Sequence, residues 1–227
     1  MDTVMDIMAG TGTILIAATM GRKVICIELE EEYQALHQLL LSRLEAQDIQ
    51  PSGLSKMATL LQGDCRDFLP IPVNHIIFSP PYATAMTVKK NPRTDAGKQL
   101  AGGKVSTDGS INGEAQYDFT KYHKSRNNIS LLNPFYYNHA MEKIYQLCYQ
   151  SLLPKGTLTV VLKDSISNGK RVELTDWMVR TCVRQGFIVK DWFKRDSPGG
   201  GYQKLWRSRG YLTVQDEDIV LFKKEKQ

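Results

Sequence analysis

Short runs of consecutive apolar residues alternate along the chain with segments in which apolar residues recur every three or four positions. Runs of the first kind, such as residues 24–27, are typical of strands in a sheet that is covered on both faces. The second kind predicts amphipathic helices, as in residues 31–47, where Tyr33, Leu36 and Leu40 share one face. The predicted strands are residues 3–7, 24–27, 58–61, 75–78, 157–162, 187–189 and 219–222, and the predicted helices are residues 14–20, 31–47, 140–148 and 172–185. This alternation predicts an α/β fold with a mostly parallel sheet.

One long segment, residues 83–133, breaks this alternation. Its central part, residues 98–115, is rich in glycine and small polar residues, which is typical of a surface loop. The chain has 227 residues, about one and a half times the length of a typical domain of ~150 residues. We therefore predict a single domain, residues 1–227, that carries residues 83–133 as an insertion.

Composition excludes several classes of protein. Hydrophobic residues make up 42% of the chain and charged residues 23%, which are ordinary values for a globular domain and exclude wholesale disorder. No stretch approaches the ~20 apolar residues of a membrane span, and Asp2 and Asp6 lie where a signal peptide would be basic. The four cysteines are far apart and form no Cys-x-x-Cys pair, which favours reduced thiols over a disulfide framework or a zinc site. We expect a cytoplasmic protein without a metal.

The net charge of +5 is concentrated in two segments. Residues 83–133 and 184–210 are both strongly basic, whereas the rest of the chain is slightly acidic. This pattern favours a surface that faces a polyanion, although solvated basic loops are an equally good interpretation of composition alone. Aromatic residues lie among the cations, an arrangement suited to phosphate contacts beside stacking rings. The predicted nucleic-acid contacts are Lys121, Lys124, Arg126, Lys204, Arg207 and Arg209.

A glycine-containing turn follows the first predicted strand. Gly10 and Gly12 let the backbone approach a ligand closely, so we expect a side chain at Gly12 to exclude that ligand without disturbing the fold. The turn is not the dinucleotide pattern Gly-x-Gly-x-x-Gly, because Leu15 occupies the third glycine position, and no Gly-Lys-Ser/Thr follows as in a P-loop. A bound phosphate is therefore disfavoured at this turn.

Acidic residues end the next two predicted strands. Glu28 lies sixteen residues after Gly12, where a carboxylate can accept both hydroxyls of a ribose. Asp64 follows the third strand and could accept from an adenine amino group. Because ligands of parallel sheets bind at the carboxyl ends of the strands, these residues are expected to meet the glycine-containing turn. The alternative is that Glu28 and Asp64 only cap the elements that follow.

Ser79-Pro80-Pro81-Tyr82 follows the fourth predicted strand. Two prolines remove two backbone donors and stiffen the loop, so a serine oxygen, a free carbonyl and an aromatic ring are presented at the ligand edge. An ordinary turn at the end of a strand is the alternative interpretation. The position beside a nucleoside-like site favours a catalytic role.

The sequence at these positions resembles a known enzyme family. Residues 6–13, Asp-Ile-Met-Ala-Gly-Thr-Gly-Thr, resemble the cofactor motif of S-adenosylmethionine-dependent amino methyltransferases acting on DNA. Residues 79–82 resemble the family's catalytic (D/N/S)-P-P-(Y/F) motif, and Glu28 and Asp64 fall where it keeps its ribose-binding and adenine-binding acids. Residues 219–222 look like its closing strand. The resemblance implies a Rossmann-like class I fold, with a mostly parallel seven-stranded sheet and an antiparallel last strand.

The resemblance also implies roles for individual residues. The cofactor would be S-adenosyl-L-methionine, with contacts from Asp6, Met8, Ala9, Gly10, Thr11, Gly12, Thr13, Glu28 and Asp64. The catalytic group would be Ser79, Pro80, Pro81 and Tyr82. Ser79 Oγ and the Pro80 carbonyl would orient an exocyclic amine, and Tyr82 would stack on a base flipped out of DNA. Serine at the first motif position is more typical of N4-cytosine than of N6-adenine enzymes, as found in restriction–modification systems.

Several alternatives remain open at this point. The target could be N6 of adenine, or the same chemistry could act on rRNA or tRNA, and a non-catalytic nucleic-acid-binding subunit would share the fold. C5-cytosine chemistry is disfavoured, because no cysteine follows a proline. The family has a segment before its first strand that covers the methionine end of the cofactor, whereas Asp6 lies only five residues after Met1. Three interpretations stay open: the sequence is a truncated form, a homodimer or a partner chain completes the pocket, or the cofactor binds weakly.

Overall fold

The computed structural model describes residues 1–46, 53–81, 127–167, 169–196 and 201–225. Its main sheet has seven strands in the order β3-β2-β1-β4-β5-β9-β8. Their bounds are β1 Thr3–Asp6, β2 Lys23–Glu28, β3 Ala58–Gln62, β4 Val73–Phe78, β5 Leu152–Leu162, β8 Phe187–Asp196 and β9 Asp216–Lys224. Strand β9 lies antiparallel between β5 and β8, and the other paired strands are parallel. The predicted sheet, parallel except for its last strand, is confirmed.

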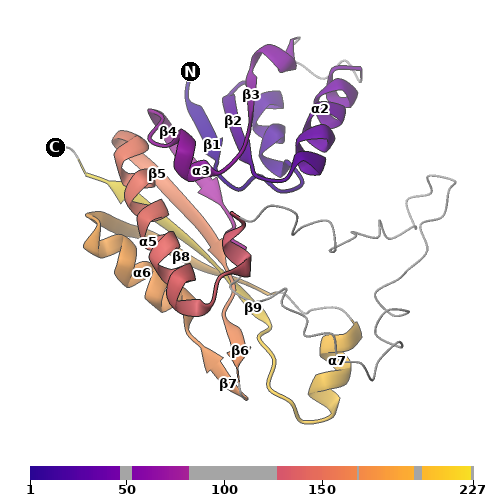
Figure 1. The fold of residues 1–227 in the computed structure, drawn as a ribbon, viewed down its shortest axis with the longest axis vertical. Coiled ribbons are helices and arrows are strands. Elements are labelled where there is room, and N and C mark those ends of the chain that lie inside the picture. Colours follow the sequence, from indigo (N-terminus) through magenta and orange to yellow (C-terminus); the bar gives the residue numbers. More distant parts are fainter. Residues whose placement is uncertain (47–52, 82–126, 168, 197–200, 226–227) are drawn as a thin grey trace, which may run out of the picture.

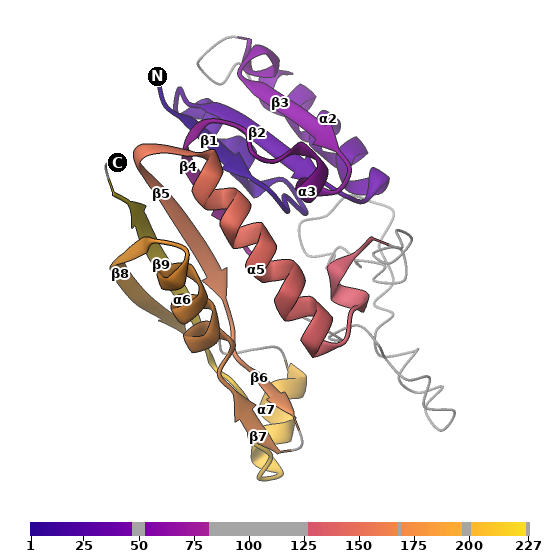
Figure 2. The ribbon, with the colours of Figure 1, turned by 60° about the vertical axis from the view of Figure 1, so that its left-hand side comes forward.

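Helices cover both faces of this sheet (Figure 1 and Figure 2). The helical elements are η1 Thr13–Leu15, α1 Ile16–Thr19, α2 Glu31–Ala46, η2 Leu54–Lys56, α3 Cys65–Phe68, η3 Ile129–Leu131, α5 Pro134–Ser151, α6 Leu174–Arg184 and α7 Gly201–Ser208. Alternate residues of β2 separate the two cores: Val24 and Cys26 pack with α1 and α2, whereas Ile25 and Ile27 belong to the larger cluster with α5 and α6. Burial on both faces explains why β2 is a continuous apolar run.

Several predicted elements differ from those observed, and the helix expected at 140–148 is longer, spanning Pro134–Ser151. The helix expected at 172–185 begins at Leu174, because Lys170–Val172 forms strand β7, which pairs with β6 Ser165–Ser167. The strand expected at 187–189 continues to Asp196 and pairs with β9. Its additional residues are exposed and mostly polar, so the pattern of apolar residues does not predict them. The sequence Pro154-Lys-Gly156 predicts a turn but lies inside β5, where Lys155 has φ 69° and the pairing with β4 shifts register. The turn residues therefore produce a bulge instead of a strand end.

The carboxyl ends of β1, β2, β3 and β4 meet at one edge of the sheet, because these strands are parallel neighbours. The four cysteines are buried free thiols. Within the described ranges no helix is long and apolar enough to cross a membrane.

Candidate functional site

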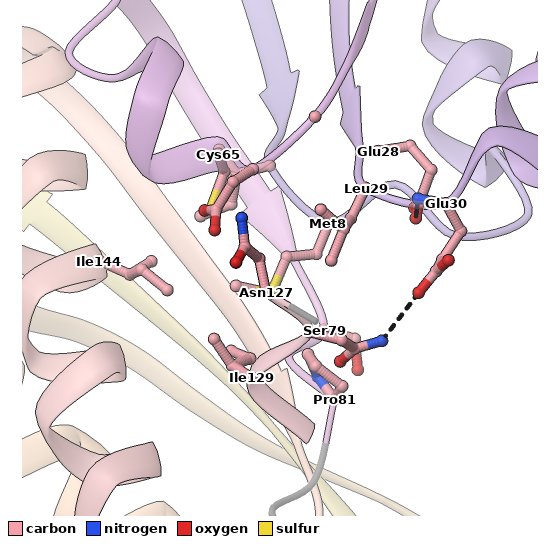
Figure 3. A pocket seen from close by; sticks show the side chains of 14 residues that line it. Met8, Glu28, Leu29, Glu30, Cys65, Ser79, Pro81, Asn127, Ile129 and Ile144 are labelled. Carbon is pink, nitrogen blue, oxygen red and sulfur yellow. Dashed lines mark hydrogen bonds between the residues drawn. The ribbon is translucent and has the colours of Figure 1, made fainter. Parts of the chain in front are cut away.

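A pocket opens at this edge of the sheet, and Figure 3 shows the side chains that line it. In that view Cys65 lies at one end, Ser79 and Pro81 lie at the other, and Met8 lies between them. The lining comes from the ends of four strands, from η3 and from α5: Ile7, Met8, Glu28, Leu29, Glu30, Gly63, Asp64, Cys65, Ser79, Pro81, Asn127, Asn128, Ile129 and Ile144. The structure thus brings the acids predicted from β2 and β3 into one pocket with the serine and proline of the predicted catalytic motif.

The glycine-containing turn, residues 8–13, contributes to this pocket mainly by holding Glu28 in place. Met8 lines the pocket, but Ala9, Gly10, Thr11, Gly12 and Thr13 are not among its lining residues. Gly10 N–H donates to Glu28 Oε2 at 2.7 Å, and Gly12 N–H donates to the Ala9 carbonyl at 2.8 Å. Both amides are therefore used inside the protein. The turn positions Glu28 through the Gly10 amide, and the predicted contact of its glycines with the cofactor stays a prediction.

The expectation that a side chain at Gly12 acts only on the ligand is wrong. Gly12 has φ 81°, and a Cβ there would lie 2.6 Å from His37 Cδ2. His37 is fully buried, with its Nε2 2.8 Å from the Gly10 carbonyl oxygen, so it has little room to move. Burial lowers the pKa of His37, and the bond to Gly10 opposes that effect. A side chain at Gly12 therefore disturbs the packing under the turn first.

We expect Gly12→Ala to destabilise the protein more than Gly21→Ala does. Gly21 has a similar φ of 73°, but nothing lies within 4 Å of the Cβ position. Left-handed backbone strain alone costs about 1–2 kcal/mol, and overpacking against His37 adds ~1–3 kcal/mol at Gly12 only. Urea denaturation of both variants measures the difference. Equal losses of stability would contradict the close contact with His37.

Glu28 is a buried carboxylate held by two backbone amides. Its Oε2 accepts from Gly10 and its Oε1 accepts from Glu30 N–H at 3.0 Å. Burial raises the pKa of Glu28 despite these hydrogen bonds, and the neighbouring Glu30 raises it further. A carboxylate oxygen that accepts one hydrogen bond keeps a second lone pair, so both oxygens can still accept from a ligand hydroxyl.

Asp64 caps a helix and also lines the pocket, and its predicted contact with adenine stays a prediction. Its side chain accepts from Arg66 N–H at 2.9 Å as the N-cap of α3, and it also lines the pocket. Arg66 binds the same carboxylate with its guanidinium, in part through a very short contact. Burial raises the pKa of Asp64, but the hydrogen bonds and charge of Arg66 outweigh it and hold the pKa below its usual range. Asp64 is therefore an ionised, charge-compensated acceptor.

Asp6 lies beside the pocket and not on its surface. Its Oδ1 accepts from Met8 N–H at 2.9 Å, which orients the first residue of the turn that does line the pocket. Burial raises the pKa of Asp6 to about 7; the bond from Met8 lowers it and the charge of Glu28 raises it. The hydrogen bond that Asp6 accepts from Met8 N–H thus helps to fix the start of the turn.

The described part of the predicted catalytic motif follows β4 directly. Ser79 is exposed, Pro80 is buried and Pro81 is partly buried, and both Ser79 and Pro81 line the pocket. The buried proline anchors the loop to the core, where Phe78 ends the strand at 1% exposure. Tyr82 lies outside the described residues, as do Lys121, Lys124 and Arg126.

Sequence reasoning missed the side of the pocket that η3 forms. Asn128 Nδ2 donates to Glu30 Oε1 at 3.1 Å, and both side chains are buried although 98 residues separate them. Glu30 stands in the run Glu30-Glu31-Glu32, which is typical of a solvated helix start, and Asn128 falls inside the segment predicted to be an insertion. No local pattern marks either residue, because only the fold brings them together.

The second basic segment includes β8 and α7, and its predicted nucleic-acid contacts lie in α7 and directly after it. Lys204 and Arg209 are exposed, and Arg207 is partly exposed. Trp206 is 52% exposed and its ring centroid lies 4.9 Å from that of Tyr211. These cations and rings therefore lie in one exposed stretch of the described chain, and their contact with a nucleic acid stays a prediction.

Comparison with known proteins identifies the fold. No protein-family model matches the sequence, and no curated protein matches it. A methyltransferase from Pyrococcus furiosus aligns with a TM-score of 0.54 at 14% identity, over 99% of this chain and 76% of that one. A putative sarcosine dimethylglycine methyltransferase from Galdieria sulphuraria gives 0.55 at 12% identity, over 99% and 78% of the two chains. The glycopeptide N-methyltransferase MtfA complexed with sinefungin gives 0.53 at 16% identity, over 100% and 81%. The chain therefore has the Rossmann-like fold of class I methyltransferases.

Proposed function

We propose that this protein transfers a methyl group from S-adenosylmethionine to the exocyclic amino group of a base in DNA, with N4 of cytosine as the target ahead of N6 of adenine. The observation that carries the proposal is the pocket, which joins Ser79 and Pro81 to Glu28 and Asp64 on one methyltransferase sheet. The motif resemblance supplies the reaction and the polymer, because the structural similarity establishes the fold alone.

The pocket fits the cofactor chemically. Glu28 has two oxygens with remaining lone pairs for the ribose hydroxyls, and Asp64 offers an ionised acceptor for an adenine amino group. Apolar walls from Met8, Leu29 and Ile129 suit the face of an adenine ring. S-adenosylmethionine supplies an electrophilic methyl group on a sulfonium. No group of three or more metal-binding side chains occurs among the described residues.

Ser79 and Pro80 act on the nucleophile. An exocyclic amine of cytosine or adenine is a poor nucleophile because its lone pair is delocalised into the ring. Hydrogen bonds from that amine to Ser79 Oγ and to the Pro80 carbonyl localise the lone pair and direct it at the reacting carbon. The buried Pro80 keeps both acceptors fixed, so the effect is positioning plus preorganised electrostatics. Tyr82 would stack on the extruded base, as the motif resemblance implies.

Mass spectrometry of nucleosides tests the proposal. The full chain is incubated with labelled cofactor and either DNA or RNA, and the polymers are then digested. Labelled N4-methylcytosine from DNA is the expected product, whereas N6-methyladenine alone contradicts the target atom. Product from RNA alone would contradict the polymer but keep the roles of Ser79 and Pro80. Nucleic-acid binding without any transfer would indicate the non-catalytic subunit.

We expect nucleic-acid affinity to fall steeply with salt concentration, because Lys204, Arg207 and Arg209 are proposed to contact phosphates. Each neutralised phosphate contact contributes about one to the slope of log affinity against log salt, so Lys204→Ala and Arg209→Ala should each lower it by about one. Lys56 is an exposed cation in η2, outside both basic segments, and Lys56→Ala is the matched control. Fluorescence anisotropy at several salt concentrations measures the slope. A flat dependence, or an equal effect of the control, would contradict the phosphate contacts.

A further inference from the structure

Among the residues that the structure describes, the pocket lining contains carboxylates but no basic side chain. Three carboxylates, Glu28, Glu30 and Asp64, lie on its wall, and none of the described lining residues is Lys, Arg or His. Arg66 compensates the charge of Asp64, and two backbone amides support Glu28. Glu30 differs from both. Its carboxylate accepts a hydrogen bond from the neutral side-chain amide of Asn128.

Glu30 is fixed inside the pocket and does not serve as a solvated residue before α2. It is 5% exposed, and its Oε1 accepts from Asn128 Nδ2, the contact drawn as a dashed line in Figure 3. Asn128 Oδ1 accepts from Ser130 N–H at 3.0 Å and from Ser130 Oγ–H at 2.7 Å. This arrangement fixes which side of the amide faces Glu30. The exposed acids Glu31 and Glu32 begin α2 and can interact with its dipole.

We propose that Glu30, positioned by Asn128, selects the positively charged form of the cofactor over its neutral product. This inference rests on the proposed function. S-adenosylmethionine and S-adenosylhomocysteine differ by one methyl group and by the positive charge on sulfur. A buried carboxylate without a cationic partner is costly, and a ligand that brings a positive charge offsets that cost. Glu30 therefore favours binding of S-adenosylmethionine. It also favours release of S-adenosylhomocysteine, which no longer carries a positive charge on sulfur.

Calorimetry with both ligands tests the role of Glu30. In Glu30→Gln the preference for S-adenosylmethionine over S-adenosylhomocysteine should fall roughly tenfold, which corresponds to ~1.4 kcal/mol. The affinity for S-adenosylhomocysteine should change little, because that ligand has no sulfonium charge. Glu31→Gln removes an equal charge from the next residue, which is exposed, and should leave the ratio unchanged. Such a result supports selection by the buried charge.

A swapped pair separates the charge of Glu30 from its structural role. Asn128→Asp alone removes the donor and sets two carboxylates against each other, so affinity for both ligands should fall. Combining Asn128→Asp with Glu30→Gln restores a hydrogen bond of reversed direction and keeps one carboxylate in the pocket. We expect this double variant to regain most of the wild-type ratio, while thermal melting confirms that it folds.

Two results would overturn the inference in distinguishable ways. If both ligands bind and Glu30→Gln leaves their ratio unchanged, Glu30 does not select charge, although the proposed function stands. A double variant that folds but has the ratio of Glu30→Gln also contradicts selection by charge. If neither ligand binds the wild-type chain, the proposed function fails, and the inference fails with it.

Discussion

Ser79→Ala should lower the turnover number by roughly 10²–10³ while leaving cofactor affinity almost unchanged. The size of this effect is that of losing one preorganised hydrogen-bond partner of the reacting group. Ser79 is exposed and lines the pocket, so its hydroxyl is available to a substrate amine. Truncating an exposed side chain changes stability by about 0.5 kcal/mol or less, and the loss of turnover should therefore not reflect unfolding.

Two further variants make the Ser79 experiment specific. Ser165 follows the adjacent strand β5 and does not line the pocket, so Ser165→Ala should keep normal turnover. Ser79→Thr retains a hydroxyl and should keep more activity than Ser79→Ala. Single-turnover kinetics with saturating labelled cofactor measures the chemical step in all three. Near-normal turnover in Ser79→Ala would show that residues 79–81 only form a turn.

The sheet is predictable from the sequence because its strands are buried on both faces. Consecutive apolar residues in β2, β4 and β5 mark their positions, and the motif resemblance adds the antiparallel last strand. The full length of β8 is not predictable, because residues 190–196 are exposed and mostly polar. Their pairing with β9 therefore produces no pattern of apolar residues in the sequence. Helix α7 escapes prediction because its surroundings resemble a charged loop. Tertiary pairing decides these elements.

Site residues are predictable from the sequence where they end or closely follow a parallel strand. Glu28 and Asp64 both line the pocket, as expected for residues at the carboxyl ends of parallel strands. Their partners are not predictable: Arg66 neutralises Asp64 from the next helix, and Gly10 donates to Glu28 across the turn. Asn128 reaches the pocket only because η3 packs beside strand ends from a distant part of the sequence.

We expect Asp6→Asn to stabilise the protein at pH 8 and to remove much of its loss of stability with rising pH. Folding raises the pKa of Asp6 from 3.8 to about 7, chiefly through burial. The folded state therefore holds this proton more tightly than the unfolded state does. Stability is fully present below about pH 4 and falls as pH rises towards 7, because ionisation is then easier in the unfolded chain. The difference between the two pKa values corresponds to up to ~4 kcal/mol.

Asparagine isolates the charge, because its Oδ1 can still accept the hydrogen bond from Met8 N–H. Urea denaturation at pH 5 and pH 8 gives the free energy of unfolding of each protein. The wild type should lose more stability between these values than Asp6→Asn, whereas Asp67→Asn, which changes an exposed carboxylate in α3, should follow the wild type. Some slope should survive in Asp6→Asn, because burial also raises the pKa of Glu28. Parallel profiles for the wild type and Asp6→Asn would contradict a carboxyl at this position that titrates near pH 7, and the turn at Met8 would then owe its shape to the hydrogen bond alone.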